Sequence, residues 1–281
     1  MPLIATLLGA ALLVVDPTQA SAQAPAPATA QAASADAADD DAAEAETAAE
    51  PKGGEGVSPV EIIPKVELRQ VFTKLDSGVS IHDSTAEIDI QFLQRVLLRY
   101  QVPALVMETP KGQVSGIGDI QFGLIGIVAS NAHAVAALIA GTVMDTATQP
   151  SLGQGKTQLV LGAGAAFKPY RWWLAYALAQ DQFSVAGQSG RPDVDQLATD
   201  FGSVLFGKQY NWLKLDLNTT VDFPGGAVGR VYGVAEVGSL VIGRVGLFSR
   251  VSTQLVGPRF VDYSVTAGVR YLFRLEKGKP R

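Results

Sequence analysis

Charged side chains recur at alternate positions in several segments, and this spacing limits the chemistry that they could perform. Around Arg99 and Arg250, polar residues alternate with apolar ones, which places the charges on one face of a β-strand. Facing rows of bases and acids inside a closed sheet create a transverse field that sets pore selectivity; alternatively, they pair across strands and fill a narrow lumen. The candidate lumen residues are Arg95, Arg99, Asp119, Arg230, Glu236, Arg244, Arg250 and Arg270.

Hydrolytic chemistry is the second possibility that the residue types raise. A lipid-acting hydrolase needs a serine and a histidine with an orienting polar group, and His82 and His133 have Ser80, Ser84 and Ser130 nearby in sequence. Neither spacing matches a hydrolase motif, so solvated loop histidines are the better interpretation. Carboxylate pairs for glycoside hydrolysis need a defined separation, which a sequence does not supply. We therefore predict no catalytic residues and no enzyme activity.

Metal, nucleotide and nucleic-acid chemistry find little support. The chain has no cysteine and two widely separated histidines, so we expect no metal site and no cofactor. Residues 150–157 differ from a phosphate-binding loop at Pro150, and a strand pattern follows where that loop requires a helix. The net charge of −5 arises in residues 1–56, which carry nine acids and one base, while the remainder carries +3. That remainder has no basic stripe, so we expect no nucleic-acid partner.

Long alternating segments are the elements that must position these charges. From Val261 to Phe273, apolar residues occupy one face and mostly polar residues the other. Soluble strands peak at ~5–6 residues, whereas tilted bilayer-crossing strands need ~9–11. We expect about twelve strands, near 62–74, 86–101, 103–109, 117–129, 132–145, 156–168, 170–184, 195–207, 211–223, 229–241, 243–256 and 260–275.

The apolar face could turn toward lipid or toward the core of a soluble sandwich. Only 17% of the residues are charged, and aromatic residues gather near strand ends, as in the interfacial girdles of membrane barrels. The expected girdle is Trp172, Trp212, Tyr263, Tyr271 and Phe273. We therefore predict an all-β fold, an up-and-down antiparallel transmembrane β-barrel, located in the outer membrane.

The N-terminal residues differ in composition from the rest. An apolar run from Leu3 to Val15, followed by small residues, predicts a signal peptide over residues 1–22. Residues 23–60 are rich in Ala, Pro and acids and have few large apolar residues, which predicts a disordered periplasmic segment. The barrel is expected over residues 61–281.

One motif carries a family resemblance. The run from Ser115 to Ile120, followed by an apolar strand, resembles the Gly-x-Gly-Asp segment of the MetA-pathway of phenol degradation family of outer-membrane barrels. Asp145-Thr146-Ala147 stands where that family has a Pro-Thr-Gly turn. The strand that ends in Tyr271-Leu272-Phe273 resembles the terminal strand read by the barrel-insertion machinery. The resemblance implies a transporter-like barrel that passes small molecules, among them hydrophobic or aromatic ones.

The prediction is thus a passive channel, with outer-membrane lipid, the insertion machinery and an unidentified small-molecule substrate as partners. Two alternatives stay open. One is a closed structural barrel whose N-terminal tail binds a periplasmic partner. The other is a lipid-acting barrel hydrolase.

Overall fold

The computed structural model describes residues 63–273 except 94, 208–209 and 225. The signal peptide and the disordered segment predicted for residues 1–60 lie outside the described residues. Thirteen antiparallel strands make up the described part. They are β1 (Lys65–Leu75), β2 (Ser80–Leu93), β3 (Val96–Thr109), β4 (Gly112–Ile117), β5 (Gln121–Ser130), β6 (Ala134–Val143), β7 (Lys156–Tyr170), β8 (Trp173–Gly187), β9 (Asp195–Phe206), β10 (Asn211–Asp222), β11 (Val228–Ile242), β12 (Val245–Val256) and β13 (Val261–Leu272).

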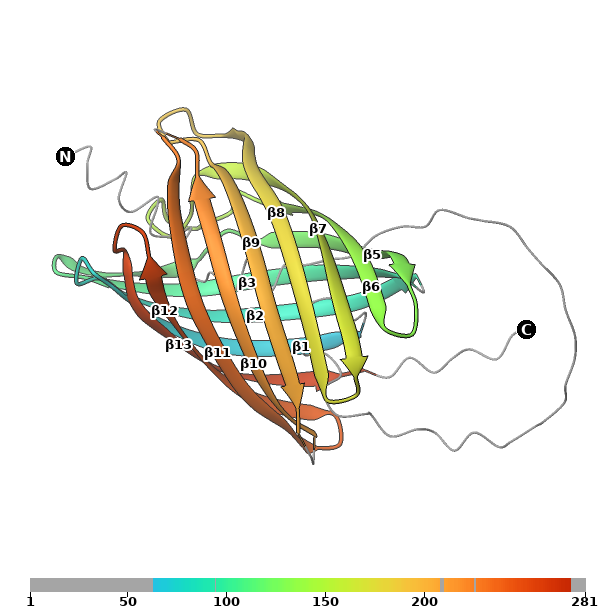
Figure 1. Cartoon of the computed structure of the whole chain (residues 1–281). Coiled ribbons are helices and arrows are strands. Elements are labelled where there is room, and N and C mark those ends of the chain that lie inside the picture. The colour runs from blue at the N-terminus through green and yellow to red at the C-terminus, as the bar shows by residue number, and fades with distance from the viewer. Residues whose placement is uncertain (1–62, 94, 208–209, 225, 274–281) are drawn as a thin grey trace, which may run out of the picture.

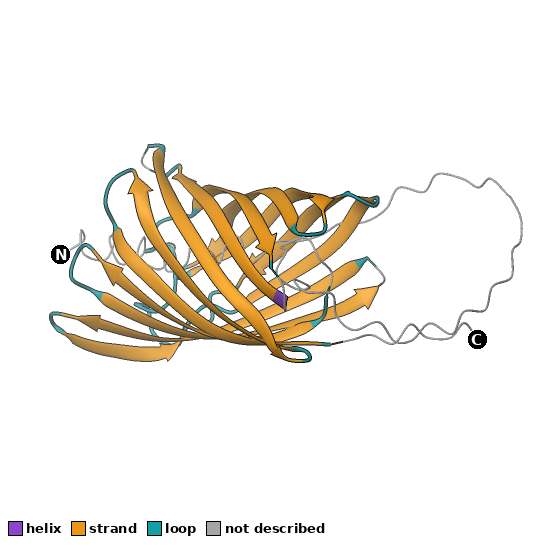
Figure 2. Ribbon diagram, turned by 60° about the horizontal axis from the view of Figure 1, so that its bottom comes forward, coloured by secondary structure: helices purple, strands orange, loops and turns teal. Residues whose placement is uncertain are grey.

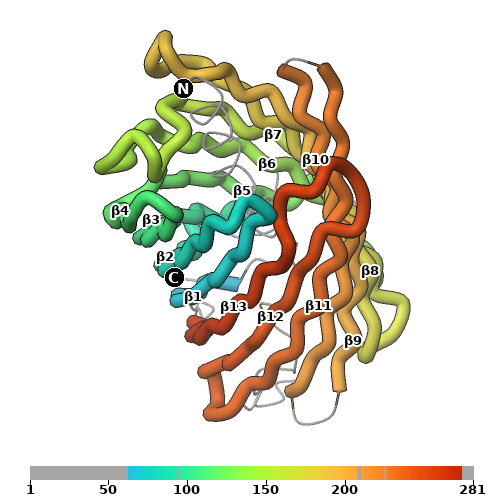
Figure 3. Tube along the Cα trace, turned by 90° about the vertical axis from the view of Figure 1, so that its left-hand side faces the viewer, coloured from blue at the N-terminus to red at the C-terminus, as the bar shows by residue number. Residues whose placement is uncertain are grey.

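The strands form one closed ring. Apart from β4 and β5, each strand pairs with its neighbours in sequence, and β1 pairs with β13, so that Lys65 lies opposite Leu272 (Figures 1 and 3). The short β4 and the longer β5 share the far edge of β3, so thirteen strands occupy twelve positions around the barrel. A closed ring has no free sheet edge, which is the condition for a sheet to cross a membrane. The predicted fold class and strand number are confirmed.

The interruption between β4 and β5 falls where β3 contains a proline. Pro103 lies between the stretch of β3 that pairs with β5 and the stretch that pairs with β4. A proline has no N–H to donate, so it is tolerated where the ladder is broken. Gly118 donates to the Pro103 carbonyl at 2.9 Å and holds the break together.

The predicted strand over 86–101 is wrong. β2 ends at Leu93, β3 begins at Val96, and Arg95 lies in the turn between them. The apolar alternation continues through a tight turn that has neither glycine nor proline, so the pattern gave no sign of a boundary. The segment predicted at 103–109 is the second half of β3.

Turns and loops gather at the two ends of the wall (Figure 2). The end that carries the N-terminus of β1 and the C-terminus of β13 has short turns, such as those at 131–133, 171–172 and 243–244. The opposite end has longer connections, of which 144–155 is the longest. Outer-membrane barrels have short periplasmic turns and longer extracellular loops. We name these ends the terminal end and the loop end.

The two faces of the wall differ as the alternation predicts. Leu215 and Leu217 of β10 are 47% and 50% exposed, whereas Lys214 and Asp216, which alternate with them, are each 5% exposed. The outward face is mostly apolar and the inward face is largely polar. Within the described residues, no helix is long and apolar enough to span a membrane.

An arginine in the middle of the outer face should cost far more than one at its edge. We expect Leu215→Arg to lower the free energy of unfolding in bilayers by about 2–4 kcal/mol, and Val256→Arg, at the loop end of β12, by about 0–1 kcal/mol. Urea titration of both variants in lipid vesicles measures the difference. Equal small costs would contradict a lipid-facing wall.

Candidate functional site

The barrel lumen is layered. Inward side chains near the terminal end form an apolar cluster that includes Leu97, Trp212, Phe248 and Leu272. Charged residues lie one or two inward positions further along the same strands, followed by neutral polar residues. A second apolar cluster, which includes Leu105, Met107, Leu152 and Tyr232, lies toward the loop end.

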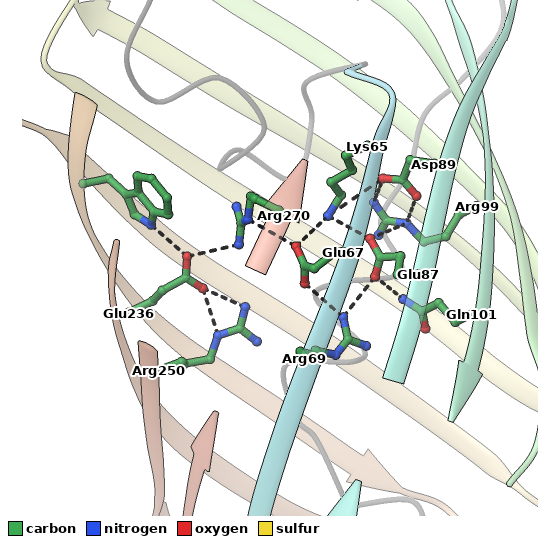
Figure 4. A network of polar contacts seen from close by, with 11 residues as sticks. Lys65, Glu67, Arg69, Glu87, Asp89, Arg99, Gln101, Glu236, Arg250 and Arg270 are labelled. Atoms are coloured by element: carbon green, nitrogen blue, oxygen red, sulfur yellow. Dashed lines mark hydrogen bonds and ion pairs between the residues drawn. The ribbon is translucent and has the colours of Figure 1, made fainter. Parts of the chain in front are cut away.

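Glu87 of β2 is the centre of a buried ion-pair network (Figure 4). Its side chain is 0% exposed, forms an ion pair with Lys65 Nζ at 2.8 Å and accepts a hydrogen bond from Arg69 Nη1 at 3.0 Å. Gln101 Nε2 donates to it at 2.5 Å, and Arg99 Nε lies 3.4 Å away. Two side chains from β1 and two from β3 therefore surround one carboxylate of β2, which joins the three strands from the inside.

Two further carboxylates extend the network. Asp89 receives two hydrogen bonds from Arg99, at 2.6 and 2.8 Å, a bidentate geometry that is stronger than a single contact. Glu67 pairs with Lys65 at 3.2 Å and with Arg270 Nε at 3.2 Å. The network thereby continues from β1 to β13.

Glu236 of β11 carries the network to the far side of β13. It accepts from Arg250 at 2.7 Å and from the Trp212 indole N–H at 2.8 Å, and Arg270 Nη2 lies 3.6 Å from it. Together the linked charges are Lys65, Arg69, Arg99, Arg250 and Arg270 against Glu67, Glu87, Asp89 and Glu236. Charges buried in this way are tolerated because they are paired.

Three aromatic rings lie over glycines of the barrel wall. Tyr176, Trp212 and Phe248 stand directly opposite Gly202, Gly238 and Gly268 on the neighbouring strands. A Cβ at any of the three glycines would collide with the ring that covers it. Arg270 lies 4.3 Å from the Phe248 ring centroid and 5.3 Å from that of Trp212, within cation–π range.

Asp119 attaches the β6–β7 loop (residues 144–155) to the interruption between β4 and β5. Its carboxylate accepts backbone N–H groups of Thr146 at 3.2 Å, Ala147 at 3.1 Å and Gln154 at 2.7 Å. Leu152 of this loop is fully buried in the apolar cluster at the loop end. The loop thus packs against inward side chains of the barrel.

Glycines give this loop the room that it needs. A Cβ at Gly116 would collide with the Thr148 side chain, and one at Gly153 would lie 2.6 Å from an Asp119 oxygen. The Gly-x-Gly-Asp segment is thereby explained by packing: the glycines admit the loop and the aspartate binds its backbone.

The structure brings together four of the predicted lumen residues, Arg99, Glu236, Arg250 and Arg270. Arg230 lies closer to the loop end, paired with Asp222 and 5.6 Å from the Phe260 ring. Their role in a pathway stays a prediction.

Three placements need correction. Arg95 is exposed in the β2–β3 turn, and Arg244 is half-buried in the β11–β12 turn, because both follow the end of a strand. Asp119 binds a loop rather than lining the wall.

Four residues of the expected aromatic girdle lie on the outer face, and their role at the membrane interface stays a prediction. Trp172, Tyr263, Tyr271 and Phe273 are 42–55% exposed. Trp212 is 3% exposed and points inward, because it shares the face of Lys214 and Asp216. Trp212, Lys214 and Asp216 occupy alternate positions of the same strand, so the sequence alone could have placed Trp212 on the inward face. Lys65, Lys214 and Gln101 also belong to the lumen set, and their alternation with apolar residues could have identified them.

The residues considered for hydrolysis lie apart. His82 is on the outer face at the loop end, 5.0 Å from the Phe72 ring, and His133 is in the β5–β6 turn at the terminal end. Ser84 donates to Gln70, and no serine–histidine hydrogen bond occurs among the described residues. Lys156, of the segment that resembled a phosphate-binding loop, begins β7 and pairs with Asp193 at 2.7 Å.

Comparison with known proteins identifies the fold. No protein-family model matches the chain, and no curated protein sequence is significantly similar to it. The COG4313 outer membrane channel from Pseudomonas putida F1 superposes with a TM-score of 0.62 at 12% identity, covering 83% of this chain and 100% of that one. The NanC porin gives a TM-score of 0.56 at 6% identity, covering 73% and 98%. The KdgM porin gives 0.52 at 7% identity, covering 75% and 99%.

The architecture is therefore that of an outer-membrane β-barrel, with a closed wall, an apolar outer belt and a polar interior. The three solved structures share this fold with the chain. The narrower resemblance to the MetA-pathway of phenol degradation family is not confirmed by these comparisons.

Proposed function

We propose that this protein is a passive, non-enzymatic channel for small molecules in the outer membrane. The observation that carries the proposal is the polar inner wall: the lumen holds paired charges and amides at positions where a purely structural barrel could hold apolar side chains. At twelve strand positions the barrel is wider than the eight-stranded barrels whose interior side chains fill it. The fold shared with channel and porin barrels supports the same proposal.

The substrate class that we propose is small molecules with hydrophobic or aromatic parts. The family resemblance implies it, and the rings of Tyr176, Trp212 and Phe248 lie over glycines of the inner wall. Aromatic rings offer apolar contacts for such molecules, and the neighbouring arginines offer donors to polar substituents.

Solute flux tests the function. Proteoliposomes that contain the folded protein should swell faster than empty liposomes in a small sugar and in benzoate, and protein denatured by heat should give no increase. Swelling at the rate of empty liposomes would contradict the channel.

A closed structural barrel is the second candidate, and the complete burial of Glu87 and Leu152 favours it. In that case the ion pairs and the two apolar clusters would block the lumen permanently. The absence of flux from correctly folded protein would support this candidate.

A further inference from the structure

We propose that the acidic N-terminal segment of this chain, residues 36–55, docks on the basic turns at the terminal end of the barrel. These turns are the connections β2–β3, β5–β6, β7–β8, β9–β10 and β11–β12. The proposal concerns a surface of the barrel, so it holds whether or not the lumen conducts.

The terminal-end turns carry bases and no acids. Arg95, Arg171 and Arg244 lie in three of the turns, and Lys168 lies close to the end of β7. We name these four the terminal-end bases; Arg95 and Arg171 are exposed and the other two are half-buried. The sequence of the five connections contains no aspartate or glutamate, whereas the six connections at the loop end contain three acids and three bases.

The terminal-end bases form no ion pair within the part of the chain that the structure describes. Lys168 contacts the Phe206 ring, with its Nζ 4.9 Å from the centroid, which leaves its charge without a counter-charge. At the loop end, by contrast, Lys156 pairs with Asp193 at 2.7 Å. A group of bases without acids creates a local positive potential that attracts an acidic partner.

The N-terminal segment has the complementary charge. Residues 36–55 contain eight acids and one base, a net charge of −7. Blocks rich in one charge are often interaction tails. The acids are Asp36, Asp39, Asp40, Asp41, Glu44, Glu46, Glu50 and Glu55.

The connection of the chain brings this segment to the same end of the barrel. β1 begins there at Lys65, and the ten residues from Glu55 can span up to about 35 Å. Arg95 follows β2, the neighbour of β1, and Arg244 precedes β12, two positions from β1 on the other side. Since adjacent strands are about 4.8 Å apart, both bases lie well within that reach.

The tether also decides between two acidic occupants. Anionic lipid headgroups present charge of the same sign to these turns. The segment, however, is covalently attached beside them, and a short tether gives an effective concentration of about millimolar. Many weak ion pairs then suffice to hold it, so the segment is the favoured occupant.

Distances between two spin labels, measured by double electron–electron resonance, test the docking. The chain has no native cysteine, so Ala48→Cys in the segment and Ala132→Cys in the β5–β6 turn provide the only labels. In full-length protein in phosphatidylcholine nanodiscs, we expect a narrow distance distribution at about 0.1 M salt. It should be lost at about 1 M, where the Debye length falls from about 10 Å to about 3 Å. The pair Ala132→Cys and Ser189→Cys, both on the barrel, should be unaffected by salt.

Two matched sets of variants locate the docking surface. Changing Arg95, Arg171 and Arg244 to Gln should abolish the narrow distribution. The loop-end set, Lys111, Arg191 and Arg259 changed to Gln, removes the same charge and should keep it. Changing the eight acids of residues 36–55 to their amides leaves every barrel residue intact and should also abolish the narrow distribution, so the test survives if the first set does not fold.

A broad distribution for the wild type at low salt would overturn the proposal, as would a narrow one that persists in the amide variant. In either case, vesicles of phosphatidylglycerol test the other occupant: loss of vesicle binding in the terminal-end set alone would assign the turns to anionic lipid instead.

Discussion

Glu87→Ala should lower the free energy of unfolding of the barrel by about 3–5 kcal/mol. The substitution leaves Lys65, Arg69 and Arg99 buried around a vacated carboxylate, with the Gln101 amide unpaired as well. Removing one partner of a buried ion pair costs more than the pair contributes, because the remaining charges lose both water and counter-charge. The urea concentration at half-unfolding in lipid vesicles measures the loss.

The matched control is Glu108→Ala. Glu108 is an exposed acid near the loop end of β3, and its loss should change stability by less than about 0.5 kcal/mol. If Glu87→Ala lowered the free energy of unfolding by no more than Glu108→Ala does, the network would not hold β1, β2 and β3 together.

Asp119→Ala should release the β6–β7 loop and increase conduction. The carboxylate accepts hydrogen bonds from three partly buried backbone N–H groups of that loop, and losing hydrogen bonds to a charged group costs about 1.5–3 kcal/mol. Since 1.4 kcal/mol is a factor of ten, the population of the detached loop should rise about tenfold or more. Single-channel recordings should show longer or more frequent openings than in the wild type.

Asp145→Ala separates this effect from a simple change of charge. Asp145 lies in the same loop, and its side chain is contacted by Gln188 at 3.5 Å, so the recordings should match the wild type. If the openings of Asp119→Ala were no longer or more frequent than those of the wild type, the loop would not limit conduction through the lumen.

Alternation predicted the wall because each strand has one face in an apolar medium and the other in a polar one. Leu215 and Lys214 are adjacent in the strand, so alternation alone places the first on the outer face and the second on the inner face. The β2–β3 turn was missed because alternation does not stop when the chain reverses without glycine or proline.

The site was only partly predictable. Parity identifies Arg99, Arg250 and Arg270 as inward residues, but not which acid each one binds, because the partners come from other strands. Asp119 illustrates a second limit. Its partners are backbone N–H groups 27 to 35 residues away, and almost every residue type has such a group, so the sequence does not indicate which one is bound.

Single-channel recording from purified wild-type protein tests the central claim most directly. The preparation should first show a faster-running band on a gel when it is not boiled, because a closed barrel without free edges resists detergent until heated. From such protein we expect small, stepwise currents through a narrow, charged lumen. An electrically silent bilayer containing protein that shows this band would contradict the channel and leave a closed structural barrel.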